Sequence, residues 1–354
     1  MFLLQLLEGL ELYPGFAAPQ DLAYKEYLEY ISENVEHETP AAYGLHPNAE
    51  INFMTAQADA LFDAIAELQQ GGGGQGNAEL TAAARVKTQL DDILEKLPEP
   101  FAMLELEESL EERTPYIAFF LQECERMNHL VHEIRRSLRE LDAGLRGDLS
   151  ISEPMERLMD ALYANKVPAS WENLAWPSMA ALAPWLADFH ERHRQLQEWT
   201  VERATPRVTW ISGLFNPQAF LTAVMQVTAR KNEWPLDRVA VSCDVTKRMH
   251  PDEIDAHTRD GAYIHGLYLD GARWDVGTAA IADARMKELY PKMPVILVKA
   301  LPVEKVDAKD TYQCPVYKTQ FRGPTYVFTA GLKTRANADK WIMAGVALLM
   351  AVVE

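Results

Sequence analysis

The sequence predicts an α+β protein, in which an N-terminal all-helical region is followed by an incomplete antiparallel β-barrel with an embedded helix. Up to about residue 205, apolar residues recur at the spacing of amphipathic helices. From Arg207 onward, short runs rich in β-branched and aromatic residues alternate with turn residues, as in barrels and sandwiches. Charge divides the sequence at the same place. Residues 1–206 contain 36 Asp or Glu and 15 Lys or Arg residues, which gives this part a charge of −21. Residues 207–354 contain 16 Asp or Glu and 19 Lys or Arg residues, which gives +3, and the net charge of the whole sequence is −18.

Length and composition limit the classes of function. A chain of 354 residues is long enough for two or three compact units. The net charge of −18 argues against a nucleic-acid partner, because phosphate binding needs a basic face. The longest apolar run, Trp341–Val353, has 13 residues and is shorter than the roughly 20 that span a bilayer. We therefore predict no nucleic-acid partner and no membrane partner.

The cysteines and the N-terminus indicate a reducing compartment. Cys124, Cys243 and Cys314 are far apart and form no CxxC pair, so they predict neither a disulfide framework nor a zinc site. Met1–Leu7 is apolar but lacks the basic residues that begin a signal peptide. Because the sequence starts inside a predicted helix, we expect it to be a fragment of a longer protein.

Capping residues and apolar spacing predict the helices in order. Thr55 is a candidate cap for the second helix, Thr114-Pro115 begins the longest helix, and Ser152 begins the next. Gly71–Gly76 separates the second and third helices as a flexible connector. A short acidic helix precedes Thr114. The other helices are predicted at about 22–32, 55–70, 79–97, 115–145, 152–164 and 178–202.

The strand-rich region begins with a capped unit at 208–236. Val208–Leu214 is predicted to be a strand covered on both faces. Asn216 caps the following helix and Pro217 takes its first position. We predict that the Phe220 side of this helix packs against barrel strands, with Phe220 more than about nine-tenths buried, as core phenylalanines are.

Turn residues delimit the remaining strands. Asp270-Gly271 is the strongest short hairpin signal in the sequence and predicts that 263–269 pairs with a strand beginning at Ala272. Arg322-Gly-Pro324 is expected to join the last two long strands. The further predicted strands are 239–244, 295–301, 312–319 and 325–332.

The glycine run formally matches two nucleotide-binding patterns. Gly71-x-Gly73-x-x-Gly76 has the spacing of a dinucleotide fingerprint, but it follows a helix where that mechanism requires a strand. It also has P-loop spacing, yet Asn77 and Ala78 stand where Lys and Ser or Thr must contact phosphate and Mg²⁺. We therefore interpret the run as a linker, and predict no cofactor site.

Two histidine pairs have the spacing of metal ligands. His129 and His132, near Glu125 and Glu133, and His190 and His193, beside Glu191, each share a helix. A zinc site needs three or four converging ligands, and neighbouring arginines repel a cation. Both pairs are interpreted as solvated helix faces, so that no metal-ligating residue is predicted.

Several polar residues of the strand-rich region have the types used in a hydrolase triad, and the eight tryptophans could in principle form a ligand cage. The spacing fixes no mutual geometry for the polar residues, and the sequence has no Gly-x-Ser-x-Gly elbow. We assign them to the surface and to turns, and the tryptophans to the core, with no catalytic residue predicted. The polar residues are Ser242, Asp244, His250, His265, Asp270 and Asp275.

Over essentially the whole length, motifs in one order resemble the C-terminal region of dynein heavy chains, the microtubule motors. In the helical part these are Tyr43-Gly-Leu-His-Pro-Asn-Ala-Glu50, Arg113-Thr-Pro-Tyr116, Gln122-Glu-Cys-Glu-Arg-Met-Asn128 and Pro168-Ala-Ser-Trp171. In the strand-rich part they are Gly213-Leu-Phe-Asn-Pro-Gln218, Arg230-Lys-Asn-Glu-Trp-Pro-Leu236, Gly271-Ala-Arg-Trp-Asp275 and Cys314-Pro-Val-Tyr-Lys-Thr319. Cys243-Asp-Val-Thr-Lys247 and Gly261-Ala-Tyr-Ile-His-Gly266 are more similar to axonemal outer-arm chains than to the cytoplasmic motor.

The resemblance implies a division into three parts. Residues 1–50 would end the sixth AAA+ module as its small helical part. Residues 51–205 would form the helical half of the C-terminal domain, and residues 206–354 its β-barrel half. In this family ATP and Mg²⁺ are bound by the AAA+ ring, outside this region.

The function that the resemblance implies is non-catalytic. The region would pack on the AAA+ ring of its own heavy chain, brace or regulate it, and meet other dynein arm subunits in the cytoskeleton of a ciliary or flagellar axoneme. One alternative is a docking module for axonemal proteins, suggested by the mild positive charge of residues 207–354. Another is a free-standing enzyme with a pocket in which His265 meets a carboxylate and a nucleophile.

Overall fold

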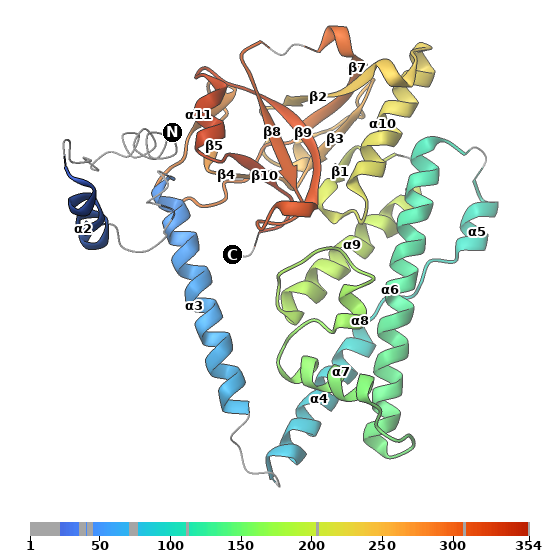
Figure 1. Ribbon diagram of the computed structural model, residues 1–354. Coiled ribbons are helices and arrows are strands. Elements are labelled where there is room, and N and C mark those ends of the chain that lie inside the picture. Colours follow the sequence, from blue (N-terminus) through green and yellow to red (C-terminus); the bar gives the residue numbers. More distant parts are fainter. Residues whose placement is uncertain are drawn as a thin grey trace.

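A computed structural model describes residues 22–34, 40, 45–70, 77–110, 113–202, 205–306 and 309–352. The protein is α+β, as predicted, with helices preceding strands (Figure 1). The glycine run Gly71–Gly76 lies outside the described residues.

The helical region follows the predicted order closely. Thr114 accepts a 3.3 Å hydrogen bond from the Ile117 N–H, which begins α6 as expected, and Gly147 ends it with a left-handed φ of 84°. The last helix begins four residues later than predicted, so Pro184 is its third residue. The helices are α2 (Tyr24–Asn34), α3 (Pro47–Gln70), α4 (Asn77–Lys96), α5 (Met103–Glu108), α6 (Pro115–Arg146), α7 (Glu153–Tyr163), α8 (Ala169–Glu172) and α9 (Leu182–Glu202).

The predicted cap at Thr55 is wrong. Helix α3 already begins at Pro47, whose fixed φ and missing N–H suit a first helical position. Thr55 lies within the helix, and its hydroxyl donates to the Ile51 carbonyl at 2.9 Å. A threonine hydroxyl can bond to the preceding turn as readily as it caps a helix, so the residue type alone misplaced the start.

The strands form two four-stranded sheets and a hairpin. One sheet has the order β1-β3-β7-β2, the other β4-β10-β8-β9, and β5 pairs with β6. Most pairs are antiparallel, but β1–β3 and β8–β10 are parallel, and no closed barrel is seen among the described strands. The strands are β1 (Val208–Trp210), β2 (Val239–Val245), β3 (Ala262–His265), β4 (Tyr268–Asp270), β5 (Ala272–Asp275), β6 (Ala280–Asp283), β7 (Ile296–Pro302), β8 (Thr311–Tyr317), β9 (Tyr326–Lys333) and β10 (Ala347–Leu349).

Two predicted strands are interrupted by glycines that pack against Trp210. The strand expected at 208–214 ends at Trp210, and a 3₁₀ turn covers Ile211–Gly213. The strand expected at 263–269 breaks at Gly266, whose φ is 90°, so that β3 and β4 belong to different sheets. A Cβ on either glycine would lie 2.3 Å from the Trp210 ring. The close approach of this indole therefore requires glycine at both positions.

The hairpin predicted at Asp270-Gly271 is also wrong. The backbone turns there, with a φ of 77° at Gly271, but β4 pairs with β10 and β5 pairs with β6. Strand β10 belongs to the apolar C-terminal run, and all its residues are buried. Because β10 is buried beside β4, β4 pairs with β10 and not with β5. Strand pairing depends more on which side chains are buried together than on the residues of the turn.

The embedded helix α10 (Pro217–Asn232) lies between α6 and the strands (Figure 1). It contacts α6 on one side and β2 and β7 on the other. A single cluster of buried apolar residues runs from α4 through α6 and α10 into both large sheets. Cys124, Cys243 and Cys314 are buried free thiols in the structure. Within the described part of the sequence, every helix is too short or too polar to cross a membrane.

Candidate functional site at the junction of the two regions

The junction between the helical and strand-rich regions is formed by aromatic rings from α6 and α10. Phe220 on α10 is fully buried, as predicted. Its ring centroid lies 5.6 Å from Phe119 and 6.1 Å from Tyr116, both on α6. The prediction placed the Phe220 side of α10 against the strands. In the structure this side also packs against helix α6, within the apolar cluster that continues into the strands.

A buried carboxylate joins α6 to the start of α10. Glu123 is 1% exposed and accepts hydrogen bonds from the backbone N–H groups of Phe215 at 2.6 Å and Asn216 at 3.0 Å. Burial raises the pKa of Glu123, and the two N–H donors oppose that rise. Asn216 in turn caps α10 as predicted, since its side chain accepts from the Ala219 N–H at 3.2 Å. The carboxylate thus orients the N-terminus of α10.

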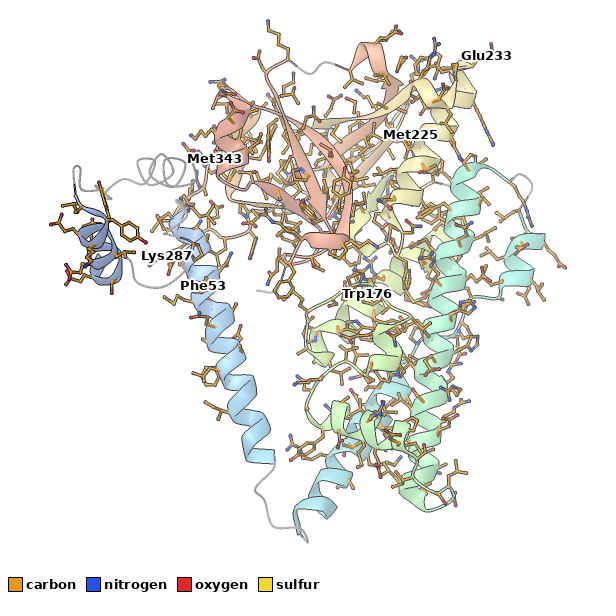
Figure 2. The ribbon with its side chains drawn as sticks, in the orientation of Figure 1. Phe53, Trp176, Met225, Glu233, Lys287 and Met343 are labelled. Atoms are coloured by element: carbon orange, nitrogen blue, oxygen red, sulfur yellow. The ribbon has the colours of Figure 1, made fainter. Side chains whose placement is uncertain are left out.

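A buried arginine lies on the neighbouring helix. Arg192 on α9 is 3% exposed, and its Nε donates to the Asp188 carboxylate at 3.0 Å. Its guanidinium lies 4.0 Å from the centroid of the Trp176 ring and 5.3 Å from that of Trp210. Burial lowers the pKa of Arg192, and the Asp188 carboxylate opposes this. Figure 2 places Trp176 beneath the strands, at the same junction.

Sequence reasoning missed Glu123 and Arg192 as junction residues. A signal was present, because both occupy apolar-stripe positions of their helices. Glu123 is flanked on the buried side of α6 by Phe120 and Met127, and Arg192 lies between Phe189 and Leu196. A charged residue at such a position is buried, and it then needs a specific partner.

The two histidine pairs behave differently from each other. His129 and His132 are exposed on α6, as predicted. His193 is not on a solvated face: it is 6% exposed, stacks on Phe101 at 4.5 Å and has Nε2 3.2 Å from the Glu99 carbonyl. The segment before α5 covers it, which the spacing of α9 alone could not reveal. No group of three metal-binding side chains occurs among the described residues.

The six polar residues considered for a triad do not come together. Asp244 pairs with Lys299 and Asp270 with Arg322, each at 2.7 Å. Asp275 accepts from Gly277 and Thr278 in the turn that follows β5. His250 directly precedes the 3₁₀ turn at Pro251–Glu253, and Ser242 lies on β2. Asp244, His250, Asp270 and Asp275 thus lie at the surface or at turns, as predicted, whereas Ser242 is half-buried within a strand.

His265, the remaining member of that set, lines a cavity of about 500 Å³ between α9 and β3. Glu191 and Asp252 also line it, while Arg194 bonds to Glu191 and Glu198 across its wall. Burial lowers the pKa of His265 to about 4. Among the described residues that line this cavity there is no Ser, Thr, Cys or Lys, so His265 shares the cavity with carboxylates but with no hydroxyl, thiol or amine nucleophile.

A second contact between distant segments fixes the start of α3. Asn48 is 6% exposed, and its Nδ2 donates to the carbonyls of Arg285 at 2.8 Å and Glu288 at 2.9 Å. Its Oδ1 accepts from the Lys287 N–H at 2.8 Å. Figure 2 shows Lys287 and Phe53 close to the upper end of this helix. The Asn48 side chain therefore helps to attach α3 to the loop before β7.

Comparison with known proteins identifies the family. The family model for the C-terminal domain of the dynein heavy chain matches residues 55–350. The sequence is 52% identical to "Dynein beta chain, ciliary" of Heliocidaris crassispina, 51% to "Dynein axonemal heavy chain 17" of Homo sapiens and 48% to "Dynein beta chain, flagellar outer arm" of Chlamydomonas reinhardtii. Each match spans 98% of this sequence but 8% of the relative. The resemblance stated from the motifs is confirmed, and the protein belongs to the family of C-terminal domains of dynein heavy chains.

Proposed function

We propose that this protein is the non-catalytic C-terminal region of an axonemal dynein heavy chain, which packs on the AAA+ ring of the same heavy chain and braces or regulates it. Its place is then the axoneme of a cilium or flagellum, with other dynein arm subunits as neighbours. ATP and Mg²⁺ are bound by the ring and not by this region. The relatives, of which the sequence spans 8%, supply the family context for this proposal.

The observation that carries the proposal is an uncovered apolar face on α3. Met54, Leu61, Phe62 and Ile65 lie at helical spacing and are 53%, 63%, 71% and 43% exposed. Full burial of a side chain of this kind contributes about 1.5–3 kcal/mol. A contiguous apolar face of this type marks an interaction surface. A ring belonging to the same heavy chain is the partner that covers it in our proposal.

We also propose that the two large sheets form an incomplete barrel. Strand β2 of one large sheet contacts β9 of the other, and β6 also contacts β9. We infer that the sheets act as one curved half of the domain, with 51–205 as its helical half and 1–50 as the end of the preceding module.

The test uses the full heavy chain with the substitutions Leu61→Glu and Phe62→Glu. Because both side chains are exposed, the substitutions leave this region folded, while they place charge in the proposed contact with the ring. We expect altered ATP turnover and altered microtubule gliding. Leu104→Glu is the matched control, since Leu104 is 81% exposed on α5 and lies outside the α3 face. Unchanged motor output in the double variant would contradict the bracing role.

A separate measurement addresses the absence of catalysis. The 354-residue protein should neither hydrolyse ATP nor bind it with micromolar affinity. Either activity, measured by phosphate release or by calorimetry, would overturn the non-catalytic assignment.

A docking role for the strand-rich region has one observation in its favour. Arg207, Lys231 and Arg259 line a depression of about 180 Å³, where Asp260 pairs with Lys231. Arg207→Glu with Arg259→Glu should abolish capture of axonemal partners by the 354-residue protein if that role exists. Retention of those partners would exclude docking through this depression, and failure of the unsubstituted protein to capture any partner would remove this alternative.

A further inference from the structure

Basic residues meet at the edge of the sheet where strands β1 and β3 begin. The two strands are parallel neighbours, so the segments that precede them lie at the same edge. Arg207 directly precedes β1, and Arg259 lies in the loop before β3. Both line the depression of about 180 Å³ described above, together with Lys231 near the end of α10. Three separate segments therefore bring positive charge together in a protein whose net charge is −18.

The loop before β3 is held in place on two sides. Lys231 Nζ donates to the Arg259 carbonyl at 3.0 Å and to the Asp260 carboxylate at 2.6 Å, which attaches the loop to α10. Gly261 follows with a φ of 87°, and a Cβ there would lie 2.0 Å from the Val298 carbonyl oxygen on β7. Only glycine allows this close approach. These contacts fix the backbone from which the Arg259 side chain extends.

Two arginines at the depression keep an uncompensated charge. Asp260 pairs with Lys231, so its carboxylate is already neutralised. The exposed side chains of Arg207 and Arg259 form no hydrogen bond or ion pair with any residue that the structure describes. A guanidinium stays charged at every pH at which proteins fold, and its planar N–H groups suit bidentate pairing with an anion. The depression therefore attracts an anion of more than one charge.

A buried hydroxyl is a second, independent indication of a ligand. Tyr116 on α6 is 8% exposed and lines the depression from its inner side. Buried tyrosine hydroxyls usually have a hydrogen-bond partner. The Tyr116 hydroxyl has none among the described residues, yet it is not one of the polar groups that are closed off from solvent. Burial raises the pKa of Tyr116, so the hydroxyl keeps its proton and can donate into the depression.

Size and geometry select the kind of anion. The depression is much larger than the roughly 10–15 Å³ that hold one water, but smaller than the roughly 300–1,000 Å³ of pockets that enclose a whole ligand. Donors on several sides suit the oxygens of a tetrahedral phosphate better than a carboxylate, whose acceptors lie in one plane. A phosphate monoester carries a charge of about −1.5 to −2 at neutral pH, which matches the two unpaired arginines.

We propose that this depression binds the phosphate group of a phosphorylated serine or threonine side chain on a partner protein. Arg207 and Arg259 pair with its outer oxygens, and the Tyr116 hydroxyl donates to its innermost oxygen. The remainder of the partner lies outside, because the depression is too small to enclose it. This inference rests on the docking alternative described above, for which it names the chemical group that is recognised, and it does not depend on the bracing of the ring.

The test titrates the 354-residue protein into a fluorescently labelled, blocked Gly-Ala-Ser-Ala-Gly peptide, in phosphorylated and unphosphorylated forms. Fluorescence anisotropy should show saturable binding of the phosphorylated form alone. Arg207→Gln with Arg259→Gln should weaken this binding about tenfold or more, because both charge-assisted contacts are lost. The matched control is Arg238→Gln with Arg335→Gln, which removes two exposed arginines of the strand-rich region outside the depression and should leave binding unchanged.

Tyr116→Phe tests the inner donor separately. The variant keeps the ring and loses one hydroxyl, so it should fold normally and bind the phosphorylated peptide about two- to tenfold more weakly. Unchanged binding in this variant would overturn the contact assigned to Tyr116.

The remaining outcomes decide between sources of the anion. Inorganic phosphate that binds as tightly as the phosphorylated peptide would overturn the assignment to a partner's side chain. Equal binding of both peptide forms, or binding that persists in the double arginine variant, would overturn the phosphate site. If the phosphorylated peptide does not bind, but Arg207→Glu with Arg259→Glu abolishes capture of axonemal partners, the docking alternative stands and the phosphate assignment alone is wrong.

Discussion

The Glu123 carboxylate accepts a 2.6 Å hydrogen bond from the backbone N–H of Phe215, a residue 92 positions later in the sequence. The acceptor comes from the N-terminal third of α6, the longest described helix, and the donor lies shortly before the embedded helix. The bond therefore couples the two regions at a point closed to water.

Removing this carboxylate should destabilise the fold. Glu123→Ala leaves the N–H groups of Phe215 and Asn216 buried without an acceptor, which costs about 1–3 kcal/mol for each unpaired group. Urea denaturation measures the free energy of unfolding. Glu125→Gln, an exposed change on the same helix, should stay within about 0.5 kcal/mol of the unsubstituted protein. Equal stability of the two variants would show that Glu123 contributes nothing at the junction.

The glycine at the β3–β4 break should not tolerate a side chain. Gly266→Ala meets both a φ of 90° and a ring atom of Trp210 at 2.3 Å. Gly147→Ala is the matched control, because its φ is 84° but nothing lies within 4 Å of the added Cβ. The control should lose about 1–2 kcal/mol from the left-handed backbone alone. A similar loss for Gly266→Ala in thermal denaturation would mean that Trp210 moves aside freely.

Acid should weaken the fold through His265. The pKa of this ring is lowered from 6.5 to about 4 in the folded protein, first by burial and then by the charge of Lys292, while Glu191 and Asp252 oppose the change. Protonation therefore favours the unfolded state. The stability that this group contributes is fully present above about pH 6.5 and is lost as the pH falls through about 4.

The measurement is urea denaturation between about pH 7 and pH 4, where the loss from this group reaches at most about 3 kcal/mol. The free energy of unfolding of the His265→Gln variant should change less with pH. The control is His129→Gln, at an exposed histidine, which should keep the pH dependence of the unsubstituted protein. The pKa values of His190 and His193 are also lowered by burial, so some acid sensitivity should remain in the variant. An unaltered profile for His265→Gln would contradict the assignment.

The attachment of α3 should depend on Asn48. Asn48→Ala removes three hydrogen bonds to the loop at 285–288, and hydrogen exchange at the Lys287 amide should become faster. Asn48→Asp should have a larger effect, because a carboxylate would face two carbonyl oxygens. Gln57→Ala, at an exposed position of the same helix, is the control. If Lys287 stays protected in both Asn48 variants, the loop is held by other contacts.

The helices could be predicted because their signals are local. Thr114, Pro115 and Gly147 mark the ends of α6 within a few residues of each boundary, and the apolar spacing fixes the buried side. The strands could be predicted as segments but not as partners. Asp270-Gly271 is a genuine turn, but the strand that pairs with β4 is β10, which lies far along the sequence. Turn rules consider only neighbouring residues and therefore do not predict this pair.

The junction was the least predictable part, because it depends on which helix faces meet. Glu123 and Arg192 appear in the sequence as ordinary charged residues of charged helices. Only the packing of α6 and α9 against the strand-rich region shows that one accepts backbone N–H groups and the other lies against tryptophan rings. His193 was misassigned for the same reason, since Phe101 covers it from another segment.

The attachment of Asn48 has a mechanical consequence. Its amide bonds to backbone groups up to 240 residues away, so a pull applied at the start of α3 acts directly on the loop between β6 and β7. Hydrogen bonds from one side chain that act together resist such tension better than the same bonds broken one at a time. Under load, this residue would be one point at which force enters the strand-rich region.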